Sequence, residues 1–192
     1  MNAVSKIQEK FLLLQIQQQQ DAASFGKVYE LLSEPIFRFI YFKIDDEEMA
    51  KDLTAEVFLK CWRDLTKSGR GEVKHLRAYF YTVARNMVID HYRAREQGTE
   101  AGTLSFEQVK VEPVSNSMEE QVERIVDCVL VMSIVKRLKA SYQEVIILKH
   151  VEGLSLSEIA IVIKKTPVAT RVLLHRANLA LKREYAQHIQ HP

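Results

Sequence analysis

GLSLSEIAIVIKKTPVATRVLLHRA, residues 153–177, has the pattern of two helices joined by a three-residue turn. Ser155 and Glu158 have the spacing of a capping box, in which a hydroxyl and a carboxylate each satisfy an unpaired backbone N–H at the start of a helix. Thr166 and Pro167 suit the N-cap and the first position of a second helix, where a missing N–H costs nothing. The stretch therefore predicts a helix-turn-helix, a motif that places side chains in the major groove of DNA.

The overall composition is that of an ordinary globular protein, with 192 residues of which 47% are hydrophobic and 27% charged. Long stretches without glycine or proline favour an all-helical fold. The first residues lack the apolar core of a signal peptide, and no apolar run reaches membrane-spanning length, so we expect a cytoplasmic protein without membrane insertion. Cys61 and Cys128 belong to no Cys-x-x-Cys or Cys/His cluster, so we expect buried thiols and no metal or other cofactor.

Charge is segregated along the chain, although the net charge is only +2. Residues 45–56 and residues 97–127 each carry a net charge of −5, whereas residues 60–95 and residues 128–192 each carry +6. Two basic blocks separated by an acidic one indicate two places that meet a polyanion. The alternative is that the same charges form solvated helix faces.

Helical spacing of apolar residues divides the chain into two small helical domains. A short helix is expected before residue 20, followed by an N-terminal domain over residues 20–96. Residues 97–117 contain two glycines, a proline and no helical period, which is typical of a flexible linker. A C-terminal domain over residues 118–188 ends in the helix-turn-helix. The sequence thus predicts an all-α protein of two domains joined by a flexible linker.

Two details of the predicted helices depend on single residues. Within the first long helix of the N-terminal domain, over residues 25–44, Pro35 is expected to cause a break or a kink. In the C-terminal domain, Ser141 is expected to cap a helix that runs to His150, with Glu144 at its third position.

Three segments carry a resemblance to a known family: DLTAEVFLKCW (residues 52–62), HLRAYFYTVARNMVIDHYRAR (residues 75–95), and LKASYQEVIILKHVEGLSLSEIAIVIKK followed by LLHRANLALKREY (residues 138–185). In this order they resemble the extracytoplasmic-function (ECF) sigma factors, compact bacterial transcription initiation subunits. The resemblance implies a protein that binds core RNA polymerase and directs it to promoter DNA without being an enzyme. Members of the family are often held by an anti-sigma factor.

The first of these segments is similar to the part of a sigma factor that docks on the polymerase clamp. An initiation factor holds a large basic partner, so acidic residues on one helix face are expected at the contact. Asp52 and Glu56 are four residues apart and share a face. The predicted polymerase-binding residues are Asp45, Glu48, Asp52, Glu56 and Phe58. The same acids could instead be only the solvated side of a core helix, to whose apolar stripe Trp62 is assigned.

The second segment is similar to the helix that melts the promoter and reads its minus-ten element. Its aromatic residues are interleaved with arginines, and aromatic faces with cations nearby are well suited to capturing unstacked bases. The resemblance places Asn86 just before the loop that cradles a flipped base, whose edge an amide can read. The predicted minus-ten residues are Tyr79, Tyr81, Arg85, Asn86 and Arg93. Phe80 and one of the tyrosines are expected in the core, and Asn86 could instead form only local hydrogen bonds.

The third segment is similar to the domain that reads the minus-thirty-five element, but it departs from the usual family pattern. Lys164 replaces the common turn glycine, and Leu173 replaces a polar or basic residue. Val172 and Leu173 could contact thymine methyl groups, or could instead pack against a neighbouring helix or a partner. The predicted DNA-binding residues of the helix-turn-helix are Lys164, Lys165, Thr166, Thr170, Arg171, His175 and Arg176.

Two other functions compete with that of a sigma factor. The first is a helix-turn-helix regulator that acts without being a polymerase subunit, against which the docking-like helix argues. The second is an interaction module that kept the fold and lost promoter activity, an alternative kept open by Val168, Val172 and Leu173. No Gly-rich phosphate loop, nucleophile triad or metal cluster indicates an enzyme.

Overall fold

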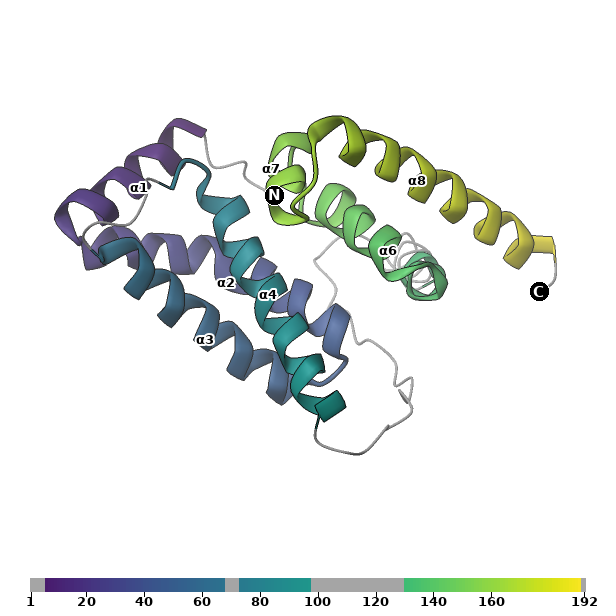
Figure 1. Ribbon diagram of the computed structural model, residues 1–192, viewed down its shortest axis with the longest axis horizontal. Coiled ribbons are helices and arrows are strands. Elements are labelled where there is room, and N and C mark those ends of the chain that lie inside the picture. The colour runs from purple at the N-terminus through teal and green to yellow at the C-terminus, as the bar shows by residue number, and fades with distance from the viewer. Residues whose placement is uncertain (1–5, 68–72, 98–129, 191–192) are drawn as a thin grey trace, which may run out of the picture. The chain divides into compact units, whose positions relative to one another are not determined.

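The computed structural model describes residues 6–67, 73–97 and 130–190, and every regular element in these ranges is a helix (Figure 1). The chain divides into two compact units, the first containing the helices up to residue 97 and the second most of the chain from residue 130 onward. This confirms the predicted all-α fold with two helical domains. Apart from its first residue, the predicted linker 97–117 lies outside the described residues, as does Cys128.

The first unit consists of α1 (Lys6–Gln19), α2 (Ala22–Ile44), α3 (Glu47–Thr66) and α4 (Leu76–Gln97). The last three helices pack against one another around an apolar core (Figure 1). Aromatic rings from all three meet there: Phe25 lies 5.0 Å from Trp62, and Phe58 lies 5.1 Å from Phe80. Cys61 is fully buried, so its prediction as a buried thiol is confirmed.

Helix α2 is continuous through Pro35, so the break expected there does not occur. Proline removes a single backbone hydrogen bond, and the burial of Ile36, Phe39 and Ile40 just beyond it holds the helix in place. The helix ends at Asp45, whose φ of 58° is left-handed and whose N–H donates to the Tyr41 carbonyl at 2.8 Å.

Helix α1 precedes the predicted N-terminal domain 20–96 and packs against its helices. Leu12, Leu13 and Ile16 are buried in this contact. At the end of α1, the Gln20 amide donates to the Thr66 carbonyl at 3.1 Å, which joins the start of the unit to the end of α3. The first unit therefore includes a helix for which the sequence predicted no packing.

The C-terminal part of the described chain contains α6 (Ala140–Ile146), the π-helical turn η1 (Ile147–Val151), α7 (Leu156–Val162) and α8 (Pro167–Gln190), and all of it except residues 160–164 belongs to the second unit. Residues 130–137 are also helical. The prediction that Ser141 caps α6 is wrong, because the helix begins at Ala140, so that Ser141 lies inside its first turn and Lys139 occupies the N-cap without a side-chain hydrogen bond. Instead, the Gln143 amide reaches back to the carbonyls of Lys136 and Leu138, at 2.9 and 2.8 Å.

Candidate functional site

The helix-turn-helix forms as predicted. At the start of α7, the Ser155 N–H donates to the Glu158 carboxylate at 2.8 Å, and the Glu158 N–H donates to the Ser155 hydroxyl at 3.3 Å. Residues 163–166 connect α7 to α8, and within them Lys164 has a left-handed φ of 54°. The Thr166 hydroxyl accepts a hydrogen bond from the Ala169 N–H at 3.2 Å and so caps α8.

One side of α8 is buried, and it contains a residue that was predicted to bind DNA. Thr170 and Ala177 are seven residues apart, lie on the same side of the helix and are both 0% exposed. The Thr170 hydroxyl donates to the Thr166 carbonyl at 2.9 Å. The prediction of Thr170 as a DNA contact is therefore wrong, because its hydroxyl is turned into the protein and bonded to its own backbone.

The opposite side of α8 is exposed and basic. Between Glu158 and Glu184 the sequence contains no acidic residue. Val168 is 72% exposed and Val172 44% exposed. Around these valines, the predicted phosphate-binding residues are all exposed: Lys164, Lys165, Arg171, His175 and Arg176. This side of the helix combines the charge needed to hold a phosphate backbone with an apolar centre.

Helix α4 presents three of the predicted minus-ten residues on one face. Tyr79, Asn86 and Arg93 follow one another at intervals of seven residues and are partly or fully exposed. The Tyr79 hydroxyl donates to Asp64 of α3 at 2.8 Å, which fixes the ring at the surface. Arg93 lies 3.6 Å from Asp90, an exposed ion pair of small energy. The face combines an aromatic ring, an amide and a guanidinium.

Tyr81 and Arg85 do not share this face. Tyr81 is 0% exposed, and its ring meets Phe39 of α2 edge-on at 5.4 Å. Its prediction as a minus-ten residue is therefore wrong, and it is the tyrosine of this helix that belongs to the core. Arg85 is one turn further along on the same flank and is partly buried. Tyr92 is held by a hydrogen bond to the Lys43 carbonyl, and burial raises the pKa of its phenol.

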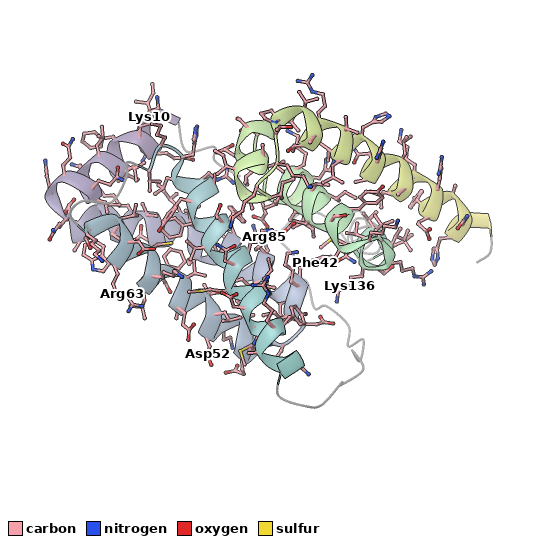
Figure 2. The ribbon with its side chains drawn as sticks, viewed as in Figure 1. Lys10, Phe42, Asp52, Arg63, Arg85 and Lys136 are labelled. Atoms are coloured by element: carbon pink, nitrogen blue, oxygen red, sulfur yellow. The ribbon has the colours of Figure 1, made fainter. Side chains whose placement is uncertain are left out.

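Helix α3 presents an exposed stripe on the side away from the core. Asp52, Glu56, Leu59 and Arg63 recur at helical spacing and are all exposed, and Figure 2 shows Asp52 and Arg63 projecting outward from the helix. Neither Asp52 nor Glu56 has a cation within salt-bridge distance among the residues that the structure describes. Both carboxylates therefore face the solvent without a direct ion pair in the described part of the chain.

The other predicted docking residues are placed differently. Phe58 is only 4% exposed and packs against Phe80, so its prediction as a contact residue is wrong, and Leu59, at 59% exposure, is the apolar residue of the outer stripe. Asp45 belongs to the turn between α2 and α3. The Lys51 ammonium forms ion pairs with both Glu47 and Glu48, at 2.9 Å each. The two hydrogen bonds, chiefly the one to Glu48, raise the pKa of Lys51.

The described residues contain neither a cluster of metal ligands nor a membrane-spanning helix. Within residues 6–67, 73–97 and 130–190, His, Cys, Asp and Glu side chains nowhere gather in threes as metal ligands would. His150 lies 3.2 Å from the Asn178 amide oxygen, which links η1 to α8. In the same part of the chain, no helix combines the length and the apolar character needed to span a bilayer.

Two family matches cover most of the chain. The family described as Sigma-70 region 2 matches residues 28–97, and the family described as Sigma-70, region 4 matches residues 128–181. The first match contains α3, α4 and most of α2, and the second contains α6, α7 and the first part of α8. Each match thus includes one or more of the exposed faces described above.

Similar proteins are sigma factors. The chain is 32% identical over 174 residues to the ECF RNA polymerase sigma factor BldN of Streptomyces coelicolor, a match that covers 89% of this chain and 64% of the relative. It is 28% identical over 160 residues to the RNA polymerase sigma factor YlaC of Bacillus subtilis, covering 83% of this chain and 91% of YlaC. The fold is similar to that of CnrH, solved in complex with the cytosolic domain of CnrY, with a TM-score of 0.67 at 18% identity over 94% of this chain and 98% of that one. Because both sigma-70 regions are present in order and the relatives are ECF sigma factors, the chain belongs to the ECF group of the sigma-70 family.

Proposed function

We propose that this chain binds core RNA polymerase and directs it to initiate transcription at particular promoters. The observation that carries the proposal is the presence, in one chain and in this order, of a region 2 and a region 4, each with an exposed face of suitable chemistry. The polymerase supplies the chemistry, so the chain itself is not an enzyme, and it acts in the cytoplasm, where bacterial promoters lie.

The outer stripe of α3 is the proposed polymerase-docking surface. Asp52 and Glu56 supply exposed negative charge that forms no direct ion pair in the described part of the chain, and charge of this kind speeds the encounter with a basic partner. Leu59 adds an exposed apolar side chain next to them, which can be buried on binding. The N-terminal domain, residues 20–96, therefore carries the contact with the polymerase.

The outer face of α4 is the proposed site for the minus-ten element. A partly exposed Tyr79 ring can stack on an unpaired base, the Asn86 amide can read a base edge, and Arg93 can contact a phosphate. Residues 97–117 then connect this face to the C-terminal domain, residues 118–188, whose basic α8 is proposed to hold the minus-thirty-five element.

Run-off transcription with purified core polymerase from the same organism tests the proposal. We expect that the chain co-elutes with core polymerase and that transcripts start at defined promoters only when it is added. Tight binding of duplex DNA by the chain alone, without association with the polymerase, would instead support a separate helix-turn-helix regulator. An anti-sigma partner, implied by the family, stays a prediction of the sequence.

A further inference from the structure

The exposed side of the first two turns of α8 has an apolar centre between two basic edges. Val168 and Val172 are one turn apart and lie opposite the buried Thr170. Arg171 lies on one edge of this strip and Arg176 on the other, and both are exposed. Leu173 lies beyond the second edge and is partly buried, so it is not part of the strip.

Few polar groups remain at this end of the helix to read the edges of bases. The Thr166 hydroxyl caps the helix by accepting a hydrogen bond from the Ala169 N–H, and the Thr170 hydroxyl is buried and donates to the Thr166 carbonyl. Arg171 is the one other polar side chain between residues 166 and 172. In a helix-turn-helix the N-terminal residues of the second helix are the ones that reach base edges. At this site, those residues are mainly apolar.

Only one base presents an apolar group to the major groove. Guanine, adenine and cytosine show hydrogen-bonding atoms there, which a valine would desolvate without replacing their partners, whereas thymine adds a C5-methyl group. We propose that Val168 and Val172 recognise thymine methyl groups in the minus-thirty-five element, while the surrounding cations hold the phosphates. This inference rests on the proposed function of the chain as a sigma factor.

The spacing of the two valines limits where the thymines can lie. One turn separates their Cα atoms by about 6 Å along the helix. Successive base pairs are separated by about 3.4 Å. The two methyl groups should therefore fall within three consecutive base pairs, on either strand. The absence of acidic residues between Glu158 and Glu184 fits duplex DNA as the occupant of this face better than a basic or neutral protein surface.

The first experiment uses unmodified protein. Holoenzyme assembled from core polymerase and the full chain transcribes a promoter library whose minus-thirty-five region is randomised, and the templates that yield transcript are sequenced. We expect two enriched thymines within three base pairs. Replacing each by deoxyuridine, which lacks only the methyl group, should then lower holoenzyme binding about fourfold, the effect of losing one buried methyl contact.

Variants of the chain assign the effect to the valines. Holoenzyme that carries Val168→Ala should bind equally well to promoters with thymine or deoxyuridine at one of the two positions. Holoenzyme that carries Val172→Ala should do the same at the other position. Leu179→Ala, an apolar truncation of similar exposure two turns further along α8, should keep the wild-type preference. Promoter-dependent transcription with no thymine enrichment or no deoxyuridine effect would overturn this inference and leave the proposed function intact, whereas the absence of any promoter-dependent transcript would overturn the proposed function itself.

Discussion

Phe58 and Leu59 are neighbours in the chain with opposite environments. Phe58 lies under 5% exposed among the aromatic rings of the core, while Leu59 is 59% exposed beside Asp52 and Glu56. Tyr79 and Tyr81 differ in the same way on α4, since the first is tied to Asp64 at the surface and the second is fully buried. At this scale, one or two positions along a helix separate a surface residue from a core residue.

Truncating Phe58 and truncating Leu59 should therefore affect different properties of the protein. Phe58→Ala should lower the free energy of unfolding by about 3–5 kcal/mol, because it removes a buried ring and leaves a cavity. Leu59→Ala should change it by less than about 0.5 kcal/mol and yet weaken binding to core polymerase by roughly tenfold. Urea unfolding followed by the fluorescence of Trp62, the only tryptophan of the chain, reports on this unit. A strongly destabilised Leu59→Ala would contradict the placement of Leu59 on the outer stripe.

Lys164 lies in the turn between α7 and α8, and its backbone is in the left-handed conformation, with φ of 54°. A residue with a Cβ atom is strained there, whereas glycine is not. Lys164→Gly should therefore be more stable than Lys164→Ala by about 1 kcal/mol. Both variants lose the same charge, so the comparison isolates the backbone, and urea unfolding followed by circular dichroism measures it. Equal stabilities would show that the turn relaxes in the alanine variant.

At the scale of helices, residue patterns were sufficient where a local interaction determines the structure. The Ser155–Glu158 capping box and the Thr166 cap formed as predicted, because each needs only groups three residues apart. Ser141 failed as a cap because α6 begins at Ala140, which places Ser141 inside the first turn and not before it. The packing of α1 was missed because its apolar residues lie all around the helix, so that no single face stood out from the sequence.

The N-cap of α2 should make the stability of the first unit dependent on pH. Asp21 accepts hydrogen bonds from the N–H groups of Ser24 and Ala23, at 3.1 and 3.2 Å, and hydrogen bonding, chiefly by Ser24, lowers the pKa of this carboxyl below its usual 3.8. The ionised Asp21 carboxylate therefore contributes its full stabilisation well above pH 3.8. This contribution is lost as the pH falls from 3.8 through the lowered pKa of the folded protein.

The control is Asp21→Asn, which keeps an acceptor oxygen but does not titrate. Wild type should be more stable than Asp21→Asn at pH 7, and the difference should shrink as the pH is lowered towards 3. Urea unfolding followed by Trp62 fluorescence at the two pH values measures it. A difference that is independent of pH would show that the charge of Asp21 contributes nothing to the cap.

At the scale of the whole molecule, the order of motifs along the chain was enough to predict both the fold class and the family. The assignment of individual site residues was less complete. Phe58, Tyr81 and Thr170 have side chains that suit the proposed contacts, but tertiary packing turns them inward. Conversely, Leu59 went unnoticed because an exposed leucine on an amphipathic helix is identified only once the buried side is known.

The two units should divide the proposed function between them, and variants on each should separate it. Glu56→Lys reverses a charge on the outer stripe of α3, so it should weaken holoenzyme formation, most strongly at low salt where charge interactions are least screened, and lower transcription from every promoter alike. Arg171→Ala on α8 should leave holoenzyme formation unchanged and reduce transcription only from promoters that need their minus-thirty-five element. Co-elution with core polymerase at two salt concentrations and run-off assays on promoters with and without that element measure both effects. If Arg171→Ala also prevented co-elution, α8 would itself be part of the polymerase contact, and the separation of roles between the units would fail.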